Sequence, residues 1–195
     1  MINELAAQDV LDFWFGPSNE PAYGRTRPAW FRKDPAFDAQ IRERFSPLIE
    51  QALAEGLPSW RQRPQSALAE VIVLDQFTRN SFRDSPRAFA GDAIALSSAK
   101  TMVASGQHAA LLPVQRQFAY LPFEHSEDVA DQIESLRLFE QLGRQAPAFA
   151  DLLEWARRHH EIVARFGRFP HRNAILGREN TPEEAEFLLQ PGSGF

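Results

Sequence analysis

The chain of 195 residues has the length of one domain, and its 44% hydrophobic and 24% charged residues are ordinary for a globular protein. This composition excludes a disordered tail, a collagen-like fibre and a membrane bundle. The formal net charge of −5 argues against a protein whose whole surface binds nucleic acid. The absence of cysteine excludes disulfides, thiol catalysis and Cys-ligated zinc or iron–sulfur sites.

The amino-terminal residues predict no signal peptide. Residues 1–5 lack a basic region followed by an apolar run. The most apolar run, residues 71–74, is far shorter than the roughly 18 residues that indicate a membrane span. We therefore expect a cytoplasmic protein that has no membrane partner.

Signals for helix starts and ends follow one another along the chain. Asp34, Ser85 and Thr181 each precede a proline, so that the side-chain oxygen can accept from a free N–H while proline occupies the first helical position. Glu184 completes a capping box with Thr181, and Gly56 follows a long periodic run, as a helix C-terminus does. The expected helices are 6–15, 35–55, 65–81, 86–105, 113–122, 126–144, 148–167 and 182–190.

Strand signals are weak by comparison. Only residues 71–74 are rich in β-branched side chains, and they lie inside a longer helical pattern. No low-complexity linker divides the chain. The sequence therefore predicts one all-α domain of about eight helices spanning residues 1–195.

The segment 66–77 is apolar nearly all round, which is typical of a helix surrounded by protein. Its end carries a polar group: Asp75, Gln76, Arg79, Asn80 and Arg83. At about 100° per residue the last four share a face with apolar residues further up, which predicts a cavity or a buried polar network. The structural alternative is that Asp75 and Arg79, four residues apart, stabilise the helix by themselves.

A second candidate lies in the turn at residues 122–128. The pattern predicts the entrance to a helix, with Ser126 as N-cap and acids that complement the helix dipole. His125 precedes this cap, where its side chain can point into a crevice, and imidazole can serve as acid, base or ligand near neutral pH. His125 and Glu127 are therefore candidates for function, whereas Asp128 is expected to be structural.

The third candidate is a basic segment late in the chain. Residues 155–178 contain six Arg, three His and one Glu, a formal charge of +5 in an otherwise acidic chain. Within it, residues 165–173 alternate Arg with Phe, and guanidinium groups suit bidentate binding of carboxylate or phosphate. The alternatives are a solvated basic loop with its Phe side chains in the core and, for His159, a core histidine bonded to backbone.

No motif predicts a metal or a cofactor. His160-Glu161 begins like a zinc-protease helix, but Ala164 stands where the second histidine must be. The sequence has no Walker loop and no dinucleotide-binding glycine pattern. We expect neither a metal nor a cofactor.

Three separated segments resemble the bacterial family called "domain of unknown function 924". These segments are 74–80 (LDQFTRN), 122–128 (PFEHSED) and 165–173 (RFGRFPHRN), and shorter matches lie at 10–15, 30–34 and 181–184. The resemblance implies an all-α fold similar to tetratricopeptide-like stacks of helical hairpins, and no established reaction. By position it marks Asp75, Gln76, Arg79, Asn80, His125, Ser126, Glu127, His159, Arg168, His171, Arg172 and Asn173.

From these patterns we predict a central polar cleft that binds a small anionic ligand bearing carboxylate or phosphate. The expected ligand-binding residues are Asp75, Gln76, Arg79, Asn80, Ser126, Arg168, Arg172 and Asn173. The expected acid/base residues are His125, His171 and His159, with Glu127 setting the tautomer of a histidine. The alternative is a tetratricopeptide-like scaffold that binds a peptide or protein partner. A nucleic-acid partner is not expected, and the sequence predicts neither the reaction nor the oligomeric state.

Overall fold

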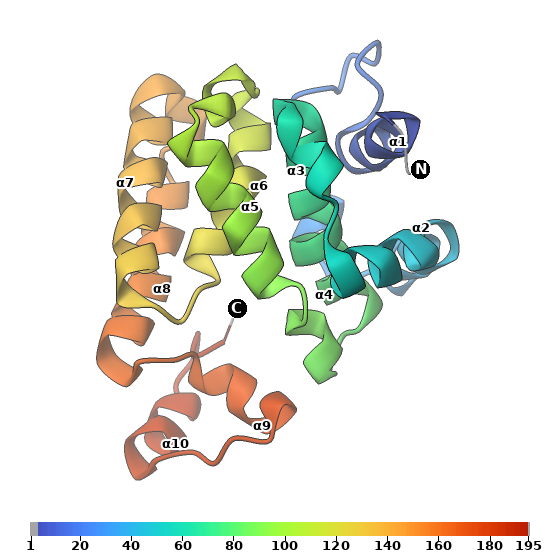
Figure 1. Cartoon of the computed structure of the whole chain (residues 1–195). Coiled ribbons are helices and arrows are strands. Elements are labelled where there is room, and N and C mark those ends of the chain that lie inside the picture. Colours follow the sequence, from blue (N-terminus) through green and yellow to red (C-terminus); the bar gives the residue numbers. More distant parts are fainter. Residues whose placement is uncertain (1–3, 195) are drawn as a thin grey trace.

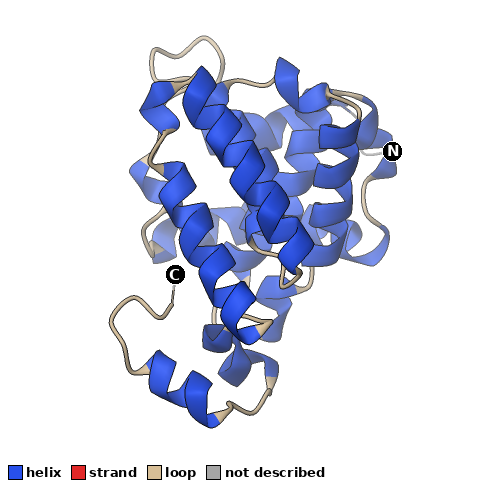
Figure 2. Ribbon diagram, turned by 90° about the vertical axis from the view of Figure 1, so that its left-hand side faces the viewer, coloured by secondary structure: helices blue, strands red, loops and turns tan. Residues whose placement is uncertain are grey.

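The computed structural model describes residues 4–194, and within this range it contains helices, turns and loops but no strand (Figures 1 and 2). This confirms the all-α prediction, whereas the tetratricopeptide-like stacking stays a prediction. The α-helices are α1 (Glu4–Phe15), α2 (Pro35–Glu55), α3 (Pro64–Val71), α4 (Thr78–Ser81), α5 (Asp92–Ala104), α6 (Pro113–Glu124), α7 (Val129–Gln145), α8 (Leu152–Phe166), α9 (Asn173–Leu176) and α10 (Pro182–Leu188). Among the described helices, none is long and apolar enough to cross a membrane.

Shorter helical turns connect these helices. A π-helical turn, η3 (Ile72–Phe77), joins α3 to α4 without a break. The 3-10 turns that bear on the site are η4 (Pro86–Phe89), before α5, and η7 (Pro170–Arg172), before α9. The expected helix 86–105 is therefore two elements, and α9 was not expected.

The predicted N-caps at Asp34, Ser85 and Thr181 are confirmed, since each side chain accepts a backbone N–H of its helix. The prediction that Ser126 caps a helix is wrong. Asp128 is the N-cap of α7, because its carboxylate accepts the Ala130 N–H at 2.7 Å, while Ser126 Oγ donates to another side chain.

The core lies around the continuous helix α3–η3–α4. Residues 67–75 are all buried, as the apolar segment predicts. The aromatic side chains Trp14, Trp30 and Phe118 pack against one another beside this helix, with ring centroids 4.8–5.9 Å apart. Burial of such side chains stabilises the fold by about 1.5–3 kcal/mol each. Helices α6, α7 and α8 pack alongside, and α9 and α10 lie below the other helices in Figure 1.

One close approach sets the distance between α5 and the central helix. A Cβ atom at Gly91 would lie 2.2 Å from the backbone oxygen of Leu74, so only glycine fits here. Gly91 is the residue before α5, and Asp92 follows it directly. The glycine therefore brings the Asp92 carboxylate up to the central helix.

Replacing Gly91 by alanine should destabilise the protein, because the new methyl group forces α5 away from backbone that cannot give way. We expect a loss of about 1–3 kcal/mol in the free energy of unfolding, measured by urea denaturation. The matched control is Gly194→Ala, whose Cβ would be 3.6 Å from its nearest neighbour. Equal stability of the two variants would contradict the close approach.

Candidate functional site

Five elements bring polar side chains together inside the helical assembly. Asp75 and Arg79 come from η3 and α4, Asp92 from the start of α5, His125 from the end of α6, and Arg172 from η7. Consecutive contacts join them at 2.7–3.4 Å. We call these five residues the central polar cluster. It unites the three segments that the sequence singled out.

Asp75 is the most buried member of the cluster, with 1% of its surface exposed. Its carboxylate accepts hydrogen bonds from His125 Nδ1 at 2.7 Å and Gln76 Nε2 at 2.6 Å, and Arg79 Nη1 lies 3.0 Å away. Burial alone would raise the pKa of this carboxyl, but the charges and hydrogen bonds around it, led by Arg79, hold the pKa well below its usual range. Asp75 is therefore ionised at neutral pH.

The contact with Asp75 fixes the tautomer of His125. An ionised carboxylate only accepts, so Nδ1 carries the proton and Nε2 is left with its lone pair. Burial and the charge of Arg79 lower the pKa of His125, which keeps the ring neutral at pH 7. The arrangement is that of a general base oriented by a carboxylate. Asp75 takes the orienting role that was predicted for Glu127.

Arg172 differs from Arg79 in how its guanidinium is used. Arg79 pairs with both oxygens of Asp92, at 2.8 and 3.0 Å. Arg172 lies over the rings of Phe89 and Phe169, 4.8 and 4.5 Å from their centroids. Only 8% of its side chain is exposed. Its one hydrogen bond within residues 4–194 runs from Nη1 to Asp92 at 3.4 Å, and Nε is buried without an acceptor.

The surroundings of Arg172 disfavour its charged form. Burial and the nearby Arg79 lower the pKa of Arg172 to about 10. A buried donor without an acceptor costs free energy that the protein recovers only when an acceptor arrives. The Nε edge of Arg172 is therefore the part of the cluster that lacks a hydrogen-bond acceptor.

His159 and Glu124 form an uncharged pair next to the cluster. His159 Nδ1 donates to the Trp155 backbone oxygen at 2.9 Å and lies 3.3 Å from Glu124 Oε1. Burial lowers the pKa of His159 to about 3, and burial with the charge of Asp75 raises the pKa of Glu124 to about 8. The adjoining His171 has a pKa lowered to about 4 by burial and Arg172. These three groups are therefore neutral at pH 7.

The structure separates part of the polar group predicted on the central helix. Asn80 Nδ2 donates to Asp38 at 2.7 Å, and Arg83 pairs with the same carboxylate. They lie outside the central polar cluster because Asp38, which belongs to α2, binds both side chains. The Asp75–Arg79 pair is present, as the structural alternative predicts, and also belongs to the cluster.

Most of the other predicted site residues fix the position of the carboxyl-terminal segment through hydrogen bonds and ion pairs. Arg168 pairs with Glu184 at 2.6 and 2.8 Å, and Asn173 Nδ2 donates to Asn180 at 2.7 Å. Glu127 pairs with Arg178 at 2.7 Å and accepts the backbone N–H of Phe169. Ser126 Oγ donates to Asp131 at 2.9 Å. The Ser126 contact is local to the start of α7, whereas the contacts of Arg168, Asn173 and Glu127 hold η7 in place.

Sequence reasoning did not select Asp92, Phe89 or Glu124 as site residues. Asp92 looks like an ordinary acid in the first turn of a helix, and Phe89 like a core residue. Glu124 has a usable signal, because it is a carboxyl group that follows the apolar run 118–123 directly before His125.

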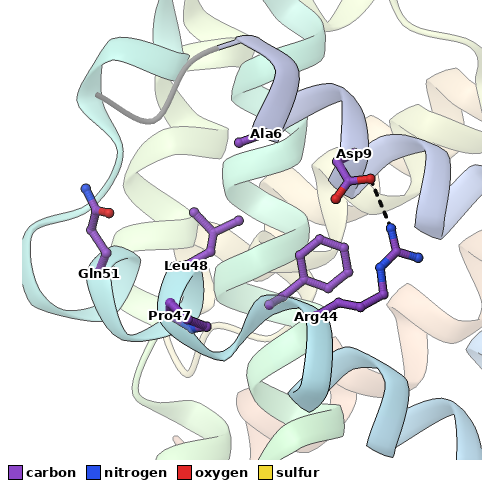
Figure 3. A pocket seen from close by; sticks show the side chains of 7 residues that line it. Ala6, Asp9, Arg44, Pro47, Leu48 and Gln51 are labelled. Carbon is purple, nitrogen blue, oxygen red and sulfur yellow. Dashed lines mark hydrogen bonds and ion pairs between the residues drawn. The ribbon is translucent and has the colours of Figure 1, made fainter.

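A surface depression of about 300 Å³ lies elsewhere, between α1 and α2 (Figure 3). An Asp9–Arg44 ion pair of 2.9 Å crosses its side, and none of the predicted site residues lines it. Its lining is Ala6, Asp9, Arg44, Phe45, Pro47, Leu48 and Gln51. Within residues 4–194 no three His, Asp or Glu side chains are placed to hold a metal ion.

Burial of Glu124 predicts a stability that depends on pH. Its pKa rises from 4.5 to about 8 on folding, so the folded state keeps a proton that the unfolded state releases. Stability should therefore fall as pH rises through this window, by on the order of 4 kcal/mol in all. Glu124→Gln removes this contribution. The stability of the variant minus that of wild type should therefore be larger at about pH 8.5 than at about pH 5.5.

Urea denaturation of both proteins at the two pH values measures this effect. Glu161→Gln, at an exposed position of α8, is the control and should follow the wild type. A stability difference between Glu124→Gln and wild type that is the same at both pH values would show that Glu124 is ionised in the folded protein.

Two comparisons place the chain among known proteins, and no curated protein matches it. The family model described as "Bacterial protein of unknown function (DUF924)" matches residues 10–192. The structure of a protein of unknown function from Agrobacterium tumefaciens is similar, with 38% identity and a TM-score of 0.81. The match covers 94% of this chain and 97% of the other. The chain belongs to the bacterial DUF924 family.

Proposed function

We propose that the central polar cluster binds a small anionic molecule bearing carboxylate or phosphate, and that His125 serves as its general base. The observation that carries the proposal is the state of Arg172. A guanidinium held between two phenyl rings, with a buried Nε that has no acceptor, is prepared for an oxyanion that lies along its edge. Phenyl faces fix the plane of the guanidinium without using its N–H groups.

The surrounding charges support an anion rather than a cation. The carboxylates that could repel an anion are already paired, Asp75 and Asp92 with Arg79 and Glu127 with Arg178. Glu124, the remaining buried acid of the site, is uncharged at neutral pH. Arg79 already pairs with two carboxylates, so Arg172 is the cation that can exchange its weak contact for a ligand.

The acid/base part of the proposal rests on the Asp75–His125 pair. Asp75 holds the Nδ1 proton at 2.7 Å and leaves Nε2 able to take a proton. The pair and Arg172 are connected through Arg79 and Asp92, so a ligand held by Arg172 lies within the same cluster. Arg168 and Asn173 act in this proposal by positioning η7 and do not contact the ligand.

Arg172→Met separates this function from a structural role. Methionine fills a similar volume without a charge, so we expect the ligand-free protein to gain about 1 kcal/mol of stability, because a poorly paired buried charge is removed. The same variant should lose the stabilisation that an anion gives to wild type, which reaches about 2.7 kcal/mol at a hundred times Kd. Thermal unfolding with and without sulfate and propionate measures both effects.

Arg168→Met is the matched control, because Arg168 is an arginine of the same segment that is already paired with Glu184. It should lose stability and keep the response to anions, which also corrects for the general effect of sulfate on folded proteins. An unchanged anion response in Arg172→Met, together with lower stability, would assign Arg172 a structural role and contradict the proposal.

A further inference from the structure

We infer that the ligand of the central polar cluster carries a hydroxyl group beside its anionic group, and that His125 selects for it. The inference rests on the proposed function, since it requires an anion held by Arg172. It names the chemical class of the ligand: a small hydroxylated carboxylate or a hydroxylated phosphate ester.

The first step is the hydrogen-bonding state of His125. Its Nδ1 proton is committed to the Asp75 carboxylate, which is itself held by Gln76 and Arg79. Rotation or tautomer exchange of the ring would break this contact inside the protein, where it cannot be replaced by water. His125 Nε2 is therefore a fixed acceptor, and within residues 4–194 nothing donates to it.

The second step is the chemistry that can satisfy this acceptor. A ligand that supplied only carboxylate or phosphate oxygens would place acceptors against the Nε2 lone pair, which is repulsive. The ligand must therefore present a donor. An ammonium group would find no unpaired carboxylate in the cluster, because Asp75 and Asp92 already balance the charges of Arg79 and Arg172. A neutral hydroxyl group meets both requirements.

The third step is that the two contacts belong to one site. Arg172 and Arg79 both contact Asp92, and Arg79 also contacts Asp75, which holds His125. The chain of contacts from the Arg172 guanidinium to the His125 ring contains no link longer than 3.4 Å. In this proposal one small molecule lies across these contacts, with its anionic group at the Arg172 edge and its hydroxyl at Nε2.

The experiment compares anions that differ by one hydroxyl group. Isothermal titration calorimetry measures binding of lactate against propionate, and of 2-hydroxyethyl phosphate against ethyl phosphate. We expect the hydroxylated member of at least one pair to bind about tenfold tighter to wild type, since one buried hydrogen bond is gained. The two pairs distinguish a carboxylate ligand from a phosphate ester.

His125→Asn tests the residue. Asparagine places its amide nitrogen where Nδ1 lies, so the contact with Asp75 is kept, while no atom takes the place of Nε2. The variant should lose the tenfold preference between the paired anions. His108→Asn, at a histidine of the 3-10 turn η5 (Gln107–Ala110), is the control and should keep the preference.

The outcomes separate the two proposals. Equal binding of the paired anions by wild type, with loss of both in Arg172→Met, would overturn the hydroxyl inference and leave the anion site standing. A preference that persists in His125→Asn would overturn the role of His125. Failure of wild type to bind any of the four anions would overturn the anion site and, with it, this inference.

Discussion

The arrangement of the site depends on one side chain, the guanidinium of Arg79. Its two terminal nitrogens contact the Asp75 backbone oxygen, the Asp75 carboxylate and both oxygens of Asp92, all at 2.8–3.0 Å. Arg79 thereby fastens the central helix to the start of α5. Only the rigid fork of an arginine can serve two carboxylates in this way. Without it, the buried Asp75 carboxylate would lose a charged partner, at a cost of several kcal/mol.

The contacts of Arg79 give the two arginines of the cluster different roles. Arg79 keeps Asp75 ionised, and the ionised Asp75 fixes the proton on His125. It also neutralises Asp92, which is left with a weak contact to Arg172. The protein thus holds one cation for structure and one that is undersatisfied. A buried donor without an acceptor lowers the stability of the fold, and proteins commonly accept such a loss where function requires it.

The sequence predicts the helical fold well, because capping residues before proline and the apolar segment 66–77 are local signals with local causes. It also identifies the three segments that meet at the site. It fails where tertiary structure decides, because Asn80 donates to Asp38 of α2 and Arg168 pairs with the buried carboxylate of Glu184, and no local spacing predicts either contact. Asp92 belongs to the cluster because Gly91 allows α5 to approach, and that contact is visible only in three dimensions.

The state of the Arg172 Nε–H group can be observed directly by nitrogen-15 NMR of arginine-labelled protein, with Arg172→Lys used to assign the signal. On titration with sulfate or propionate, the Arg172 Nε–H proton should move downfield and saturate, because the buried donor gains a charged acceptor. The Arg168 Nε–H signal should hardly change, since this group already donates to Glu184. An Arg172 signal that does not respond, or a response confined to exposed arginines, would contradict an anion site at the central polar cluster.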